Sequence, residues 1–252
     1  MTVLCIVQAR FGSSRLPGKV LQSIGELNML ERVLSRLQRS ETIDEIVVAT
    51  TVAPADSAVE AAAIAAGVKV VRGSEFDVLD RFHQALLGFP SSHIVVRVTA
   101  DCPFIDPEVI DLVVRRLEES GSDFVANRLP PPYPRTYPVG LDVEVCTAAA
   151  LERAWRDAVL PYHREHVMPF LYENRDSFAI EVLQLETDLS GYRWTVDTPE
   201  DLEAARELAK LAGPEPFGWR HVLATAVENP HIANINADAS QKDVSHVDER
   251  WL

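Results

Sequence analysis

A basic loop near the start of the chain carries the first residues with an evident chemical use. Residues 9–19 read ARFGSSRLPGK, so Arg10, Arg15 and Lys19 cluster in a chain whose net charge is -14. The loop directly follows an apolar run, which places it at the carboxyl edge of a predicted parallel sheet, where α/β proteins bind ligands. Backbone N–H groups and fixed positive charge in such a loop bind phosphates. The competing interpretation is a solvated basic turn.

The same loop excludes two familiar nucleotide-binding motifs. Five residues separate Gly12 from Gly18, and Val20 stands after Lys19 where a P-loop has Ser or Thr. The chain also has no Gly-x-Gly-x-x-Gly, so a dinucleotide fold of the hydride-transfer kind is not supported.

Two aspartates follow apolar runs in segments that are distant in the sequence. Asp101 lies in RVTADCPFIDP (97–107), and Asp197 lies in RWTVDTPEDL (193–202). Thr198 is the predicted N-cap of the next helix, so the charge of Asp197 is not needed for capping. A strand-end carboxylate that faces a phosphate loop suits Mg²⁺, and two of them can converge on one ion. For Asp101 the alternative is an aspartate that closes a turn.

The elements that position these segments alternate between strand and helix in the first half of the chain. The predicted strands are Val3–Val7, Glu45–Thr50, Val68–Val71 and His93–Val98. The predicted helices are Met29–Arg39, Ser57–Ala66, Val78–Leu87 and Pro107–Glu119. Strands that are apolar on both faces, joined by helices, predict an α/β fold: a three-layer α/β/α sandwich with a mostly parallel sheet.

The second half of the chain has a different pattern. Residues 128–138 hold five prolines and are predicted to form a stiff surface loop or lid. The predicted strands here are Leu141–Cys146, Phe178–Leu185 and Trp194–Val196, and the predicted helices are Ala148–Ala158, Arg164–Glu173, Pro199–Leu211 and Arg220–Glu228. We expect one domain over 1–228, with an acceptor lid and a small β/α dimerisation arm within 128–190. The polar tail 229–252 either frays or packs on a partner subunit.

Composition narrows the function classes. The chain has 252 residues, 47% of them hydrophobic and 25% charged, as in an ordinary soluble globular protein. The acidic balance argues against a nucleic-acid surface or an anionic membrane as partner, and no apolar run is long enough to span a membrane. The three cysteines, Cys5, Cys102 and Cys146, fit neither a disulfide framework nor a zinc site, so we expect buried thiols and a cytoplasmic location.

The basic loop (9–19) and the two aspartate segments (97–107 and 193–202), in this order, resemble those of the cytidylyltransferases that activate acidic sugars, the CMP-Kdo and CMP-sialate synthetase group. The chain is most similar to the spore-coat polysaccharide branch of that group, over about residues 1–230. The resemblance implies a nucleotide-diphospho-sugar-transferase-like fold, a homodimer, and a Mg²⁺-dependent reaction of CTP with an acidic-sugar-like acceptor that yields a CMP-sugar and pyrophosphate.

By matching positions, the resemblance implies that Arg10, Ser14, Arg15 and Lys19 hold the triphosphate. We expect the wider nucleotide-binding set to include also Ala9, Gly12, Ser13, Arg97 and Thr99. The catalytic set would be Lys19, Arg10, Arg15 and Asp101, and the Mg²⁺ ligands would be Asp101 and Asp197. The resemblance also puts residues 76–82 near the nucleotide, with Arg81 or Asp80 lining the site.

The chain departs from the CMP-Kdo synthetases on the acceptor side. They show Gln-Gly-Asp-Glu-Pro where this chain has TADCP at 99–103, and their sugar-side segment is replaced by the proline-rich stretch and YPVGLDVE at 137–144. Asp142 and Glu144 alternate with apolar residues and so share one face. We expect that face, with Tyr137, to border the acceptor pocket; the alternative is a solvated strand face.

Other readings are weaker on the sequence. A glycosyltransferase of the same architecture needs a strand-end Asp-x-Asp, and a molybdenum-cofactor guanylyltransferase needs a Gly-Gly pair where Ala9-Arg10 stands. A non-catalytic nucleotide-binding subunit is the alternative outside the enzymes. His163 and His166 have helical spacing but no third zinc ligand, which favours a structural or subunit-contact role.

Overall fold

A seven-stranded sheet forms the centre of the protein. The computed structural model describes residues 1–90 and 93–239. The strand order is β5-β4-β1-β6-β8-β7-β9, and within it only β8 runs against its neighbours. The strands are β1 (Val3–Gln8), β4 (Glu45–Thr51), β5 (Lys69–Gly73), β6 (Ile94–Thr99), β7 (Phe124–Ala126), β8 (Glu144–Thr147) and β9 (Ile180–Val182). The predicted mostly parallel sheet is therefore confirmed.

Helices cover both faces of this sheet and enclose two cores. Alternate residues of β1 separate the cores, because Cys5 and Val7 pack into one and Leu4 and Ile6 into the other. The first core is completed by α1 (Met29–Leu37), α2 (Ser57–Ala65) and α4 (Pro107–Ser120). The second is completed by α3 (Val78–Leu87), α5 (Ala148–Asp157), α6 (Pro161–His166) and α7 (Pro169–Glu173). This is the predicted three-layer α/β/α sandwich.

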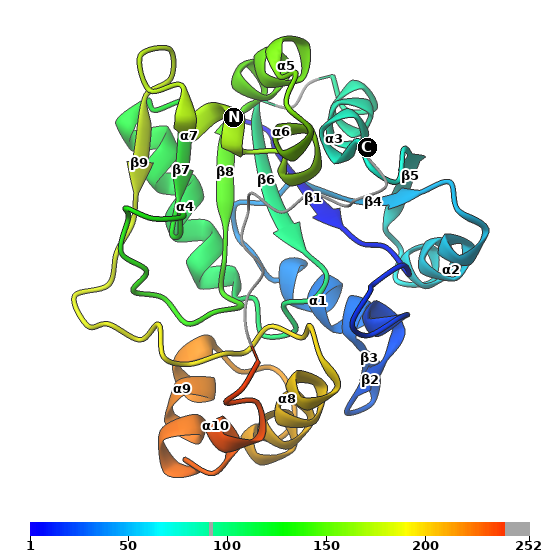
Figure 1. Ribbon diagram of the computed structural model, residues 1–252, viewed down its shortest axis with the longest axis vertical. Coiled ribbons are helices and arrows are strands. Elements are labelled where there is room, and N and C mark those ends of the chain that lie inside the picture. The colour runs from blue at the N-terminus through cyan, green and yellow to red at the C-terminus, as the bar shows by residue number, and fades with distance from the viewer. Residues whose placement is uncertain (91–92, 240–252) are drawn as a thin grey trace.

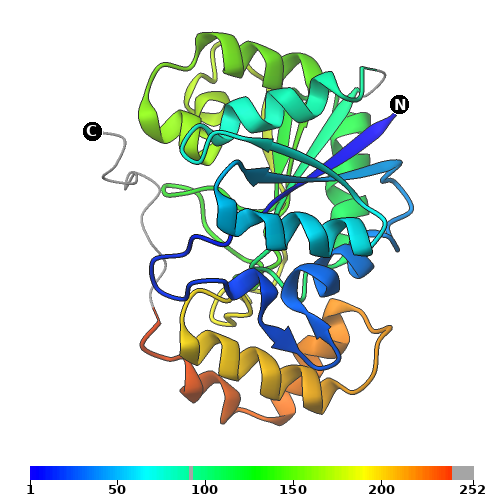
Figure 2. The ribbon, with the colours of Figure 1, turned by 90° about the vertical axis from the view of Figure 1, so that its right-hand side faces the viewer.

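Three C-terminal helices lie beyond the carboxyl end of the sheet. They are α8 (Pro199–Ala212), α9 (Trp219–Glu228) and α10 (Ile232–Ile235), and they occupy the end of the molecule opposite the N-terminus in Figure 1 and Figure 2. Strand β1 starts at the far end and runs toward them. The loops that follow β1 and β6 therefore face this helical layer, which closes one side of the sheet edge where the predicted site residues lie.

The helix ends near this edge follow from the local sequence. In α4, the Asp106 side chain accepts from the backbone N–H of Glu108, Pro107 takes the first helical position, and Gly121 ends the helix with φ 66°. In α8, Thr198 and Asp201 form a reciprocal capping box. Thr198 is thus the cap, as predicted, and the Asp197 carboxylate is not used for capping.

Several element boundaries were predicted wrongly. The strand expected at Leu141–Cys146 begins only at Glu144, and Trp194–Val196 is not a strand but follows an isolated bridge between Val139 and Arg193. The helix expected at Arg164–Glu173 is two helices, α6 and α7. They are separated at Val167, a β-branched residue that adopts φ 72° and so interrupts the helical backbone.

Three short strands had no clear signal in the sequence. Strand β7 inserts into the sheet beside β8, and β2 (Ser23–Ile24) pairs with β3 (Leu27–Asn28) in a small hairpin after the basic loop. The tail after Asn229 is not frayed throughout, because α10 packs on α8. The rest of the tail, 240–252, lies outside the described residues.

The region expected to hold a dimerisation arm contributes to the sandwich itself. Strands β8 and β9 belong to the central sheet, and α5 and α7 pack on its face. A homodimer stays a prediction. All three cysteines are buried free thiols, as expected, and burial raises the pKa of each. None of the helices in the described ranges is long and apolar enough to cross a membrane.

Candidate active site

The basic loop folds back on itself and delivers Lys19 to the sheet edge. The backbone N–H of Gly18 donates to the carbonyl of Phe11 at 2.8 Å, which closes the loop between them. Gly18 adopts φ 69°, and a Cβ there would lie 2.9 Å from the Phe11 ring, so glycine is required on both counts. The short 3-10 helix η1 (Lys19–Leu21) starts immediately afterwards, and Lys19 is only 9% exposed.

The ammonium of Lys19 lies between the two predicted metal ligands. Its Nζ donates to Asp101 Oδ2 at 2.7 Å, to Asp197 Oδ1 at 2.9 Å and to the Val196 carbonyl at 2.8 Å. All three ammonium hydrogens therefore have acceptors. The structure thus brings Lys19, Asp101 and Asp197 together, from three segments that are far apart in the sequence.

The protonation states follow from this arrangement. Burial alone would lower the pKa of Lys19, but the charges of Asp101 and Asp197 outweigh it, and the net pKa is raised. Burial alone would raise the pKa of Asp101, but Lys19 outweighs it and the pKa is lowered, with help from a hydrogen bond from Thr99. Both groups are therefore charged at neutral pH.

Backbone hydrogen bonds fix the spacing of the two carboxylates. The N–H of Val196 donates to the Asp101 carbonyl at 2.8 Å, and the Thr195 hydroxyl donates to the same oxygen at 3.2 Å. Gly140 permits the segment to approach, because a Cβ there would lie 2.6 Å from the Thr195 nitrogen. The pair is therefore held by the fold itself.

Further cations lie beside this pair. Arg15 Nη2 is 3.2 Å from Asp197 Oδ1, and Arg10 Nη1 is 3.8 Å from Glu75 Oε1 across the loop. Ala9 is buried, whereas Gly12 and Ser14 are exposed on the loop and Ser13 is half-buried. The loop residues of the predicted nucleotide set are thus contiguous with Lys19, and their role stays a prediction.

The remaining predicted residues are Thr99 and Arg97, expected at the nucleotide, and Asp142 and Glu144, expected at the acceptor. Thr99 lies next to Asp101, at the end of β6. The Arg97 guanidinium donates to the Glu144 carboxylate and, at 2.9 Å, to Gln8 Oε1. Asp142 accepts a two-point hydrogen bond from Arg135, at 2.9 and 3.1 Å. Both predicted acceptor acids are therefore paired with arginines.

Tyr137, which we expected to border the acceptor pocket, is buried in this structure. It is 2% exposed, and its ring packs 6.4 Å from that of Trp219 at the start of α9, between ring centroids. An aromatic ring has more to gain from burial in this core than from exposure on the loop. Tyr137 is therefore a packing residue in this structure.

Sequence reasoning missed a carboxylate that supports the loop. Asp56, 2% exposed, accepts from the backbone N–H of Phe11 at 2.5 Å and from the Thr51 hydroxyl. In the sequence, Asp56 only follows Pro54 in a pattern typical of any short helix start, so nothing indicated its contact with the basic loop. Asp56 therefore anchors the basic loop to the end of β4.

Arg81 and Asp80, the other residues expected at the site, point in different directions. Arg81 is fully buried, and its Nε and Nη1 have no hydrogen-bond partner in the described part of the chain. Burial, and then the charge of Arg10, lower its pKa to about 10. Asp80 instead accepts from Trp155 Nε1 at 2.9 Å, so it ties α3 to α5 and does not face the loop.

The donor set at the sheet edge fits a hard divalent cation. Two carboxylates already converge on a positive group, Lys19 Nζ, and no group of three or more His, Cys, Asp or Glu side chains with metal-binding geometry occurs among the described residues. Mg²⁺ is commonly held by one or two carboxylates together with substrate phosphates, whereas structural zinc needs four protein ligands. The residues present therefore suit Mg²⁺ brought with a polyphosphate.

Comparison with known families identifies the family of the chain. A family model described as Cytidylyltransferase matches residues 4–222. The chain belongs to the cytidylyltransferase family. It is accordingly a nucleotidyltransferase, and the matched range includes the basic loop and both aspartates.

Individual relatives agree with the family. The chain is 34% identical to the spore coat polysaccharide biosynthesis protein SpsF of Bacillus subtilis, over 94% of this chain and 96% of SpsF. It is 30% identical to a 3-deoxy-manno-octulosonate cytidylyltransferase of Anaeromyxobacter sp., over 84% of this chain and 98% of that protein. A solved cytidylyltransferase structure from Leptospira borgpetersenii superposes with a TM-score of 0.87 at 34% identity, covering 96% of this chain and all of the other.

Proposed function

We propose that this cytidylyltransferase uses a divalent cation, Mg²⁺, to transfer CMP from CTP to an acidic sugar, for the synthesis of a polysaccharide or glycan precursor. The observation that carries the proposal is the placement of Lys19, the last residue of the basic loop, between Asp101 and Asp197: its Nζ lies 2.7 Å from Asp101 Oδ2 and 2.9 Å from Asp197 Oδ1. The relationship to proteins named for 3-deoxy-manno-octulosonate and for spore coat polysaccharide supports the acceptor class.

The transfer balances without a covalent enzyme intermediate. An acceptor oxygen forms a bond to the α-phosphorus of CTP, the bond from that phosphorus to the bridging β-oxygen breaks, and pyrophosphate leaves with the electron pair. The acceptor proton passes to solvent or to a base on the substrate. Such reactions depend on positioning and on neutralising charge. The bound cation would supply charge neutralisation on the phosphates.

The residues of the chain contribute positive charge on the leaving-group side. Arg10, Arg15 and Lys19 lie on the basic loop, and Lys19 is held in place by the carboxylates until a triphosphate competes for it. The buried guanidinium of Arg81 adds positive charge behind the loop, and its Nε and Nη1 have no hydrogen-bond partner within residues 1–90 and 93–239. In an overall acidic chain, these groups create a local positive field for a polyanion.

The acceptor side offers guanidinium groups for a carboxylate. Asp142 and Glu144 already occupy Arg135 and Arg97, respectively. The carboxylate of an acidic sugar would replace one of these partners in a two-point arginine contact. In this proposal Arg135 and Arg97 recognise the acceptor, although Arg97 was expected at the nucleotide, and the two acids hold both arginines in place beforehand.

Pyrophosphate release tests the proposal directly. The protein is incubated with CTP, Mg²⁺ and a panel of acidic sugars, and release is followed by a coupled assay. Asp101→Asn should lower kcat at least about 100-fold, the scale of losing one preorganised electrostatic contact to the transition state. Asp157→Asn, on the exposed side of α5, is the matched control and should leave kcat unchanged. Retained turnover in Asp101→Asn would remove that residue from the site.

A further inference from the structure

The carboxylate of Asp201 collects more hydrogen bonds than its helix cap requires. It is 1% exposed, and its Oδ2 accepts from the backbone N–H groups of Asp197 at 3.0 Å and Thr198 at 3.1 Å. Its Oδ1 accepts from Arg193 Nε and from Asn236 Nδ2, both at 2.9 Å. A capping box explains only the bond from Thr198. The others come from Arg193 and Asp197, in the segment directly before α8, and from Asn236 near the C-terminus.

Arg193 links this carboxylate to the predicted metal ligand. Its guanidinium makes a two-point contact with Asp201, and Nη2 also donates to Asp197 Oδ2 at 3.0 Å. Burial alone would lower the pKa of Arg193, but its two carboxylate partners outweigh it and raise the pKa. A planar guanidinium can bridge two carboxylates in this fixed geometry, which a lysine cannot reproduce.

The two oxygens of Asp197 therefore face different partners. Oδ2 is tied to Arg193, whereas Oδ1 lies 2.9 Å from Lys19 Nζ, the atom that also contacts Asp101. Oδ1 is thus the oxygen turned toward the Asp101 side. The backbone of Asp197 is held by Asp201 as well, so both its main chain and its side chain are fixed by the same network.

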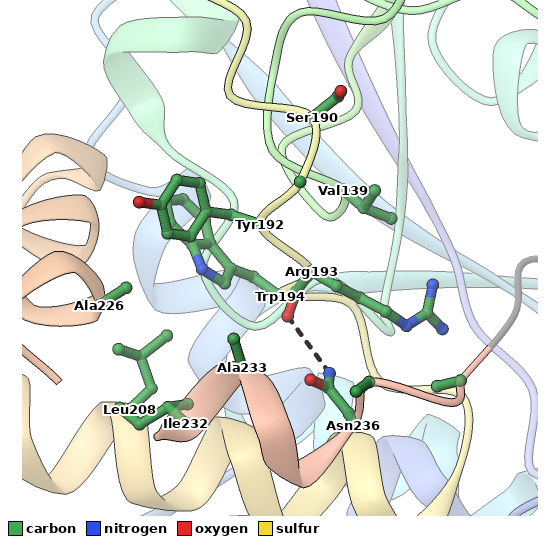
Figure 3. A pocket seen from close by; sticks show the side chains of 13 residues that line it. Val139, Ser190, Tyr192, Arg193, Trp194, Leu208, Ala226, Ile232, Ala233 and Asn236 are labelled. Carbon is green, nitrogen blue, oxygen red and sulfur yellow. Dashed lines mark hydrogen bonds between the residues drawn. The ribbon is translucent and has the colours of Figure 1, made fainter. Parts of the chain in front are cut away.

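Asn236, the C-cap residue directly after α10, connects the end of that helix to this network. Its side chain lies at the edge of a cavity of about 310 Å³ between the 190–194 segment and the C-terminal helices, where Trp194, Leu208 and Ile232 provide apolar walls (Figure 3). Besides its bond to Asp201, its Nδ2 contacts the Arg193 carbonyl at 3.4 Å, the dashed line in Figure 3. An amide buried at such a wall is stabilised only because these acceptors satisfy it.

From this geometry we infer that Arg193 and Asn236 are positioning residues for the divalent-cation site: they fix the Asp197 carboxylate beside Asp101, where the two aspartates would hold the cation. The inference rests on the proposed function, because it assumes that Asp101 and Asp197 bind a cation. It makes helix α10, which the sequence presented as a tail, part of the support of the site. Partners of metal ligands in other proteins tune affinity in this way.

Binding of Mn²⁺ in the presence of CTP, measured by electron paramagnetic resonance, tests the inference without relying on turnover. Arg193→Lys should raise the Mn²⁺ dissociation constant by roughly 10–100-fold, the usual range for second-layer partners of a metal site, and Asn236→Ala by a smaller factor. Asn234→Ala, exposed within α10 close to Asn236, is the matched control and should leave the Mn²⁺ dissociation constant unchanged. Because both residues donate to Asp201, the double variant should raise the Mn²⁺ dissociation constant by less than the product of the two single-variant increases.

Thermal stability separates this role from simple packing. If Asn236→Ala and Arg193→Lys lower the Tm but keep the wild-type Mn²⁺ dissociation constant at a temperature where they are folded, the inference is overturned. A loss in the double variant equal to the product of the single losses would also overturn the shared network. If the wild-type protein with CTP binds no Mn²⁺, the proposed function fails first, and the inference fails with it.

Discussion

Replacing Lys19 with methionine should destabilise the protein, and a divalent cation should reverse much of the effect. Lys19 is the only ion-pair partner of Asp101 in the described part of the chain, and it also contacts Asp197. Methionine keeps most of the apolar stem but leaves the Asp101 carboxylate facing Asp197 without an intervening positive charge. A cation can occupy the place of the lost ammonium.

The expected magnitude follows from the burial of the pair. Removing one partner of a buried ion pair costs about 3–5 kcal/mol, and we expect about 3 kcal/mol because the Asp101 and Asp197 side chains keep 25% and 20% exposure. For a chain of this size, that lowers the Tm by roughly 6–12 °C. A cation at a free concentration 100 times its dissociation constant would restore about 2.7 kcal/mol.

Calorimetric melting in EDTA and in saturating Mn²⁺ measures both effects. Lys19→Met should melt well below wild type in EDTA, and the gap should narrow in Mn²⁺. Lys210→Met, 74% exposed on α8, is the control and should melt like wild type in both buffers. A Lys19→Met gap that stays the same with and without the cation would refute the idea that the two carboxylates form a cation site.

Three further changes probe the scaffold of the site. Gly18→Ala should lower the free energy of unfolding by about 1–2 kcal/mol, because Gly18 has the left-handed φ of 69°; chemical denaturation measures this loss. The same variant should raise the KM for CTP in a steady-state assay. Gly140→Ala should lower the free energy of unfolding by about 1–3 kcal/mol and weaken Mn²⁺ binding. The added Cβ would lie 2.8 Å from the Trp194 carbonyl carbon and would displace the segment that leads to Asp197. Unchanged Mn²⁺ binding would contradict this reasoning. Burial alone would raise the pKa of Asp201, but the hydrogen bonds that it accepts, first those from Arg193, outweigh burial and lower the pKa. The ionised Asp201 carboxylate therefore stabilises the folded protein above about pH 4, and this stabilisation is lost as the pH falls through the folded-state pKa. The Tm difference between wild type and Asp201→Asn should therefore be constant from about pH 6 to 8 and shrink toward pH 3, and a difference that grows in acid would contradict the assignment.

The parallel sheet and the location of the loop were predictable because they depend on local patterns. Val3–Val7 and His93–Val98 are apolar on both faces, which only a sheet covered on both sides can bury. The carboxyl ends of such strands share one edge, so Lys19 and Asp101 were expected to meet there. Asp197 reaches the same place by a different route, since Val196 donates to the Asp101 carbonyl without forming a strand.

The parts that sequence reasoning missed depend on contacts between distant segments. Asp201 has the sequence pattern of an ordinary first-turn acid, and no pattern indicates that Asn236, from a distant segment, donates to it together with Arg193. Tyr137 stands in a proline-rich segment that reads as exposed, yet Trp219 of a later helix covers it. The break between α6 and α7 was also not predictable, because valine rarely adopts the positive φ that Val167 has in the structure.

Calorimetric titration with CTP, UTP, GTP and ATP, each with Mg²⁺, tests the central claim most directly. We predict that wild type binds CTP in preference to the other three, that EDTA weakens this binding, and that Asp101→Asn and Asp197→Asn weaken it in the presence of Mg²⁺. Absence of CTP binding in the folded wild-type protein would contradict the account, as would CTP binding that neither EDTA nor the loss of either aspartate changes.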